Sequence, residues 1–156
     1  MSNYKLREAC IWELPYISDI CIDDNRDTLV INNQKDANLL NLKLYNQTTN
    51  ICGDLSDLIG FVNYGDRPLQ KFASNAKYIR TVYVSPKYAG QGIATDFINQ
   101  TIQEMGEDPK WNVDKGVWMQ ISEKNASMQK VANKTGFKKV DVWDYDDSRV
   151  GIWLKK

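Results

Sequence analysis

Residues 84–94 read VSPKYAGQGIA and lie between a strand-like run and a helix-like run. The preceding run, Tyr78–Val84, is rich in the β-branched and aromatic residues that favour strands. The following run, Ile93–Met105, carries apolar residues at helical spacing on one face. Gly90 and Gly92 lie between them and permit backbone conformations that other residues avoid. The stretch therefore predicts a central strand, a glycine turn and a helix in succession.

A turn of this kind is suited to binding an anion. The free N–H groups of a helix's first turn point toward one place, and the helix dipole favours negative charge there. Gln91 and Thr95 could add side-chain donors, so a pyrophosphate is a natural ligand. The spacing is neither the GxGxxG fingerprint nor a P-loop. The alternative is an ordinary strand-to-helix turn that needs glycine only for its geometry.

The composition is that of one globular domain spanning residues 1–156, with 42% apolar residues. Lysine and arginine together number 20, as do aspartate and glutamate, so the basic excess of a nucleic-acid binder is absent. No apolar run approaches the roughly 20 residues that span a bilayer. The first residues also lack the apolar region of a secretory signal. We expect a cytoplasmic protein with neither nucleic-acid nor membrane partners.

Histidine is absent from the sequence, which removes the commonest general base and the commonest metal ligand. Ser-His-Asp and Cys-His catalysis are thereby excluded. The three cysteines are widely spaced and match neither a zinc pattern nor a disulfide framework. We therefore expect reduced thiols and no metal.

The remaining segments alternate between strand and helix signals, in the order β-αα-βββ-α-β-α-ββ. This order predicts an α/β or α+β fold around one sheet. Strands are expected over residues 5–9, 50–54, 58–64, 78–84, 117–122, 138–144 and 150–155. One helix is expected to begin near residue 14, and three more are expected over residues 35–45, 93–105 and 126–134.

Two motifs in this order resemble the signatures of the GNAT N-acetyltransferase superfamily. TVYVSPKYAGQGIATDFI is similar to motif A, in which Gln/Arg-x-x-Gly-x-Gly/Ala follows a strand ending in Val-x-Pro. Lys87 stands where glutamine or arginine is usual. Asn125, followed by a short helix and Gly136-Phe137, resembles the second signature. The element order also fits this family over nearly the whole chain.

The resemblance implies a mixed central sheet in which two parallel strands, Tyr78–Val84 and Val117–Ser122, splay apart around acetyl-coenzyme A. The backbone of the first strand would pair with the pantetheine arm, and the glycine turn would hold the pyrophosphate. Asn125 would contact the pantetheine, and its alternative role is a helix N-cap. The cofactor-binding residues implied are Val82, Val84, Lys87, Ala89, Gly90, Gln91, Gly92, Ile93, Ala94, Thr95 and Asn125.

The implied activity is transfer of an acetyl group from acetyl-coenzyme A to a primary amine of a small molecule or peptide by direct attack. The amide of Val84 would stabilise the oxyanion. Many family members carry, at the position of Ala132, a tyrosine that acts as general acid. Some also carry a carboxylate on the central strand, but Tyr78–Val84 contains no carboxylate. The remaining proton-transfer candidates are Tyr78, Tyr83 and Glu123, whose alternatives are packed aromatics and a surface acid.

Alanine at position 132 keeps open a second function, that of a non-catalytic acyl-coenzyme A-binding or sensing module with the same fold. The oligomeric state also stays open. The edges of the C-terminal hairpin could pair between chains, which makes a dimer one alternative.

Overall fold

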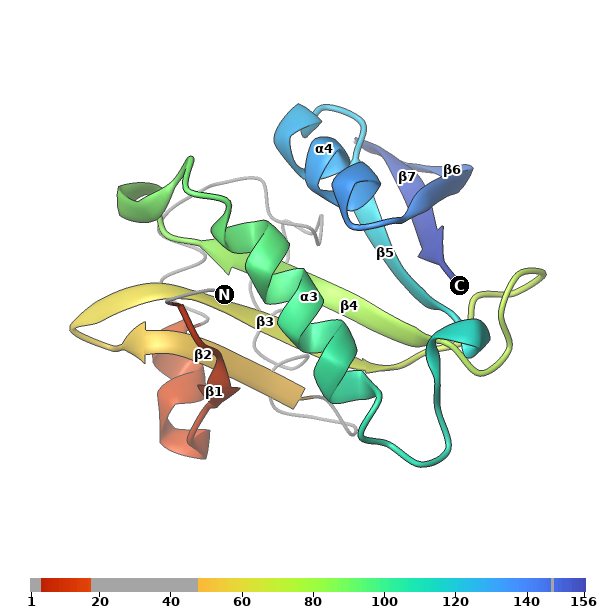
Figure 1. Cartoon of the computed structure of the whole chain (residues 1–156). Coiled ribbons are helices and arrows are strands. Elements are labelled where there is room, and N and C mark those ends of the chain that lie inside the picture. The colour runs from red at the N-terminus through yellow and green to blue at the C-terminus, as the bar shows by residue number, and fades with distance from the viewer. Residues whose placement is uncertain (1–3, 18–47, 147) are drawn as a thin grey trace.

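The computed structural model describes residues 4–17, 48–146 and 148–156. The described residues form a sheet of seven strands in the order β1-β2-β3-β4-β5-β7-β6 (Figure 1). The strands are β1 (Arg7–Glu8), β2 (Thr48–Asp54), β3 (Asp57–Asp66), β4 (Lys77–Val84), β5 (Val117–Ser122), β6 (Lys138–Tyr145) and β7 (Ser148–Lys155). The helices that the structure describes over their full length are α3 (Ile93–Met105) and α4 (Ala126–Lys134), with short 3-10 turns η1 (Ile11–Glu13), η2 (Pro86–Tyr88) and η3 (Val113–Lys115).

The predicted class and element order are confirmed for the described part of the chain. Residues 14–17 are helical, as predicted, whereas the rest of that helix and the predicted helix over residues 35–45 lie outside the described residues. None of the described helices is long and apolar enough to cross a membrane.

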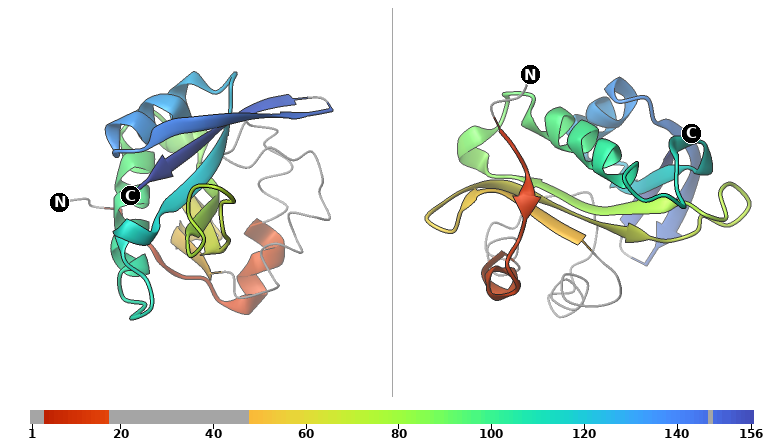
Figure 2. Two further views of the ribbon diagram at one scale, coloured as in Figure 1. Left: turned by 90° about the vertical axis from the view of Figure 1, so that its right-hand side faces the viewer. Right: turned by 60° about the horizontal axis from the view of Figure 1, so that its bottom comes forward.

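Helix α3 covers one face of the sheet, and residues 11–17 lie against the opposite face (Figure 2). The apolar stripe that predicts α3 is buried, since Ile93, Phe97 and Ile98 belong to the main core. On the opposite face, Leu14 and Ile17 pack in a separate cluster with strand residues. The sheet is therefore the middle layer of the fold.

Strands β4 and β5 are the only neighbours that run parallel among the described strands, and they pair at just two positions, Lys77 with Val117 and Tyr78 with Trp118. By contrast, β5 pairs with β7 along its whole length. Beyond Tyr78 the two parallel strands diverge, and this confirms the predicted splay.

A β-bulge lies at the point of divergence. Asn63 of β3 pairs with Thr81, but the next residue, Tyr64, pairs with Ile79, so Arg80 is an extra residue on β4. A bulge bends its strand and redirects the side chains near it. It therefore contributes to the separation of β4 from β5.

Candidate functional site

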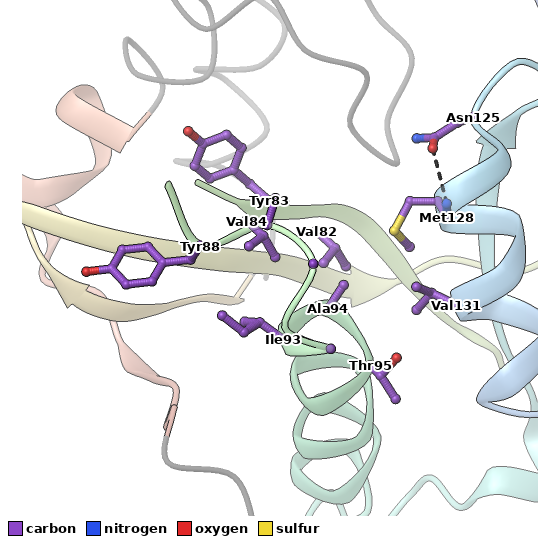
Figure 3. A pocket seen from close by; sticks show the side chains of 13 residues that line it. Val82, Tyr83, Val84, Tyr88, Ile93, Ala94, Thr95, Asn125, Met128 and Val131 are labelled. Carbon is purple, nitrogen blue, oxygen red and sulfur yellow. Dashed lines mark hydrogen bonds between the residues drawn. The ribbon is translucent and has the colours of Figure 1, made fainter. Parts of the chain in front are cut away.

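An open pocket of about 240 Å³ lies where β4 and β5 diverge (Figure 3). Its walls come from the end of β4, the glycine turn, the first turn of α3 and the start of α4. The lining residues are Val82, Tyr83, Val84, Tyr88, Ala89, Gly90, Gly92, Ile93, Ala94, Thr95, Asn125, Met128 and Val131. Nine of the eleven residues predicted to bind the cofactor are therefore brought together here.

The glycine turn needs its two glycines for backbone conformation. Gly90 has φ +82° and Gly92, the N-cap of α3, has φ +73°. A Cβ added to either would meet no atom within 4 Å, so steric space is not the constraint. Positive φ is the region that favours glycine. Gly90 and Gly92 therefore determine the backbone conformation of the turn that borders the pocket.

The first turn of α3 presents its backbone amides at the pocket. The earliest amide bonded one turn back is that of Asp96, which donates to the Gly92 carbonyl at 3.2 Å. The amides of Ile93, Ala94 and Thr95 precede it and have no carbonyl one turn earlier in the helix. These amides form the positive end of the helix dipole. Because the three residues line the pocket, that positive end lies at the pocket.

The edge of β4 that faces the pocket also carries backbone donors. The amide of Ser85 donates to the Ile59 carbonyl of β3 at 2.8 Å. Successive amides of a strand point to opposite sides, so those of Val84 and Val82 point toward β5. The ladder between β4 and β5 ends at Tyr78, before Val82 and Val84. The amides of these two valines therefore face the gap between the strands.

Asn125 caps α4, and its Oδ1 accepts a hydrogen bond from the Met128 amide at 3.1 Å (Figure 3). This geometry matches the alternative role of a helix N-cap. The residue also lines the pocket, so its amide group can contact a ligand while its oxygen caps the helix.

Met128 and Val131 form an apolar wall that sequence reasoning missed. They lie three residues apart on α4, so they share one helical face. That spacing was a signal for an inward-facing pair, but it did not distinguish a pocket wall from the core.

Two predicted residues lie outside the pocket lining. Lys87 is exposed, and its Nζ lies 3.4 Å from an oxygen of Asp57. Gln91 accepts a hydrogen bond from the Tyr4 hydroxyl at 3.0 Å. Tyr88, which does line the pocket, donates to Asp57 at 2.7 Å, and this hydrogen bond raises the pKa of the Tyr88 phenol.

The three proton-transfer candidates occupy different places. Tyr83 lines the pocket, and its ring stacks on Phe61 and points away from α3 (Figure 3). Tyr78 is buried with Trp118, their ring centroids 4.3 Å apart, and burial raises the pKa of its phenol. Glu123 accepts two hydrogen bonds from Lys139, at 2.8 and 2.7 Å. Only Tyr83 of the three therefore borders the pocket.

Ala132 is fully buried in the main core and is not part of the pocket lining. Within the described residues, the pocket-lining residues that carry an ionisable side chain are Tyr83 and Tyr88. No cluster of three or more potential ligands for a metal ion occurs in residues 4–17, 48–146 and 148–156.

The chemistry of the pocket can be read from these parts. The amides of Val82 and Val84, which no described strand pairs, suit a ligand with peptide-like groups. The helix amides and the glycine turn suit a phosphate or diphosphate. The residues present therefore fit the pantetheine and pyrophosphate of coenzyme A.

A profile of the acetyltransferase (GNAT) family matches residues 17–137. The chain belongs to the GNAT acetyltransferase family. Its glycine turn, diverging strands and capped α4 lie within the matched segment. Comparison with curated proteins found none that matches.

Solved structures of GNAT acetyltransferases share the fold. NAA60 of Arabidopsis thaliana with acetyl-CoA is 16% identical, with a TM-score of 0.72 over 97% of this chain and 98% of that chain. An acetyltransferase from Salmonella typhimurium that modifies the N-terminal serine of a 50S ribosomal subunit protein is 14% identical, with a TM-score of 0.72 over 99% and 95%. A dodecameric spermidine N-acetyltransferase from Vibrio cholerae is 15% identical, with a TM-score of 0.68 over 99% and 94%.

Proposed function

We propose that this GNAT protein is an acetyl-coenzyme A-dependent N-acetyltransferase that acts on a primary amine of a small molecule or peptide. The observation that carries the proposal is the pocket between β4 and β5, where unpaired strand donors meet the glycine turn and the start of α3. The solved neighbours support it, because they include acetyltransferases that act on the N-terminal serine of a ribosomal protein and on spermidine.

In the proposed complex the pyrophosphate lies on the amides between Ala89 and Thr95, and the pantetheine pairs with Val82 and Val84. Asn125 contacts the pantetheine while capping α4. Lys87 and Gln91 contribute only if their side chains leave Asp57 and Tyr4. The ligand would thus replace the strand partner that β4 lacks beyond Tyr78.

The proposed reaction is direct attack of the neutral amine on the thioester carbonyl. A C–N bond forms, the C–S bond breaks, the amine nitrogen loses a proton and the thiolate gains one. The Val84 amide is the proposed donor to the carbonyl oxygen as it becomes negative. Tyr83 is the candidate for proton transfer that borders the pocket, while Tyr78 and Glu123 would need a relay to reach it.

A second candidate function is a non-catalytic acyl-coenzyme A-binding module. It is favoured by one specific observation, the fully buried Ala132 at the position where many family members carry an acidic tyrosine. Both candidates bind the same ligand in the same pocket. They differ in whether thiol is released when an amine is added.

The experiment that tests the proposal has two steps. Calorimetric titration with acetyl-coenzyme A, and with desulfo-coenzyme A as its non-reactive counterpart, is expected to give one site per chain. Thiol release is then measured with a panel of amines and compared with release in buffer alone. Binding with amine-dependent release supports the enzyme, and binding without release from any amine supports the sensing module. Absence of binding at millimolar ligand contradicts both.

For its cellular setting, we propose a cytoplasmic protein whose partner is the acceptor amine rather than a nucleic acid or a membrane. A dimer through the C-terminal hairpin is the proposal for assembly, because β6 forms an edge of the sheet. Light scattering of the purified chain would measure its mass directly.

A further inference from the structure

A pair of arginines lies beside the β4–β5 gap on the side of the sheet away from α3. Arg80 is the bulged residue of β4, two positions beyond the last pair with β5. Its guanidinium carbon lies 5.3 Å from the centre of the Tyr78 ring. Tyr78 belongs to the core cluster of Trp118 and Ile152, which is separate from the core under α3. Arg80 therefore borders the gap from the face opposite α3.

Arg67 approaches the same aromatic surface. Its guanidinium carbon lies 4.9 Å from the centre of the Tyr78 ring and 5.3 Å from that of Trp118. The backbone at this position is held by Trp118, whose indole N–H donates to the Arg67 carbonyl at 2.9 Å. Two positive groups thus share one aromatic platform.

The charge of this pair is not balanced within the described residues. The ion pairs there join other side chains, and neither Arg67 nor Arg80 takes part in one. The Nε of Arg80 is buried and has no hydrogen-bond partner in the part of the chain that the structure describes. Burial and the nearby Arg67 lower the pKa of Arg80. An anionic ligand would supply the hydrogen bond and the opposite charge that the two arginines lack within the described residues.

Two consecutive hydrogen bonds position a neutral donor, the Tyr78 hydroxyl, beside the two arginines. The Tyr145 hydroxyl of β6 donates to Gln120 Oε1 at 2.6 Å, and Gln120 Nε2 donates to the Tyr78 hydroxyl at 3.1 Å. The Tyr78 oxygen is therefore the acceptor of the second hydrogen bond in this series, and the Tyr78 hydroxyl can donate its proton to a further oxygen. Guanidinium and phenol donors together suit an anionic oxygen group.

We propose that the acceptor amine carries an anionic oxygen group, a carboxylate or a phosphate, which Arg80 and Arg67 bind beside the β4–β5 gap. The proposal rests on the proposed N-acetyltransferase function and names its substrate class. It also gives the arginines a second effect, because a positive environment lowers the pKa of a nearby amine and favours its neutral, nucleophilic form. That effect is useful on a strand that offers no carboxylate base.

The test compares acceptors that differ only in the anionic group. The pairs are tyrosine with tyramine, lysine with cadaverine, and phosphoethanolamine with ethanolamine, and the readout is kcat/KM from thiol release. We expect the anionic member to be preferred by at least about tenfold, which corresponds to about 1.4 kcal/mol. The first two pairs report a carboxylate site and the third reports a phosphate site.

Variants connect the preference to the arginines. Arg80→Met should abolish the preference mainly by raising KM for the anionic acceptor, with coenzyme A affinity unchanged. Arg67→Met, at an exposed position, is the second variant should Arg80→Met fail to fold. Arg149→Gln on β7 removes the same charge from an exposed pair with Asp144 and should retain the preference.

The inference is overturned if no pair shows a preference, or if Arg80→Met and Arg67→Met both retain it. It is also overturned if neither member of any pair reacts while another amine of the panel does. Failure of the proposed function gives a different result, namely no thiol release with any amine at all, whether or not coenzyme A binds.

Discussion

Gly90 has φ +82° at the centre of the proposed pyrophosphate turn, and its Cβ position is open. This separates two effects of substitution. Gly90→Asn adds bulk but tolerates positive φ, whereas Gly90→Asp is nearly the same size and adds a negative charge. We expect the aspartate variant to bind coenzyme A at least about tenfold more weakly than the asparagine variant. Calorimetry on both folded variants measures this, and equal affinities would contradict the phosphate assignment.

Ala132 permits a test of the tyrosine that many GNAT members carry. Because Ala132 is fully buried, tyrosine there must displace core side chains. We expect Ala132→Tyr to lower the free energy of unfolding by about 1–3 kcal/mol or more and to leave kcat unimproved. Chemical denaturation and thiol release measure the two effects, and faster turnover in a stable variant would show that the phenol reaches the pocket.

At the scale of elements, Glu13 connects η1 to β1. Its carboxylate accepts two hydrogen bonds from Arg7, both at 3.1 Å, and one from the Cys10 amide at 2.7 Å. The hydrogen bonds from Arg7 are the main reason that the pKa of Glu13 is lowered. A lowered folded pKa contributes stability that is present above the unfolded value of 4.5 and is lost as pH falls through the folded value.

We therefore expect Glu13→Gln to destabilise the protein by about 1–3 kcal/mol at pH 7 and by progressively less as pH falls below 4.5. Urea unfolding of both proteins between pH 3 and pH 7 measures the difference. The exposed Glu8→Gln on β1 is the matched control and should follow the wild type. A difference that does not vary with pH would contradict the assigned role of the Glu13 carboxylate.

The edge of β4 gives a prediction for hydrogen exchange. The amides of Val82 and Val84 point toward the gap, whereas the amide of Tyr83 between them points toward β3. In the free protein we expect fast exchange at the two valines and slow exchange at Tyr83. Saturation with coenzyme A should slow exchange at the valines, as observed by NMR. Unchanged exchange at both valines with ligand bound would contradict strand-like binding of the pantetheine.

Elements with long, regular patterns were predictable from the sequence. The bounds of α3, β5 and α4 agree with the periodicity of their apolar residues. The position of β7 between β5 and β6 was not predictable, because it depends on pairing between distant segments. The bulge at Arg80 was also hidden, since no residue type marks it uniquely.

The candidate site, too, was predictable from the sequence only in part. The glycine turn and Asn125 carry local geometric signals, and the structure brings them to one pocket. Met128 and Val131 carried no signal that separates a pocket from a core. Tyr78 and Tyr83 look alike on the strand, but they lie in different clusters with different neighbours. Placement of such side chains requires the register of the whole sheet.

At the scale of the whole molecule, ligand binding should appear as added stability. A ligand that binds only the folded state at 100 times its Kd stabilises it by about 2.7 kcal/mol. We expect acetyl-coenzyme A and desulfo-coenzyme A to raise the Tm of the wild type, and to raise that of Gly90→Asp much less. Differential scanning calorimetry measures the shift. Equal shifts in both proteins would mean that the ligand stabilises the fold from another site.

Only two residue pairs join β4 to β5, so the sheet consists of two ladders, β1–β4 and β5–β7–β6. Apolar contact between the two ladders comes from α3 and α4 through the main core and from Tyr78, which packs on Trp118 in the second cluster. We expect each ladder to open as a separate foldon, because so few residue pairs cross the seam between β4 and β5. A molecule that lies along the seam and binds both margins would merge two cooperative units into one. We therefore expect the open seam between β4 and β5 also to set the number of steps in which the molecule unfolds.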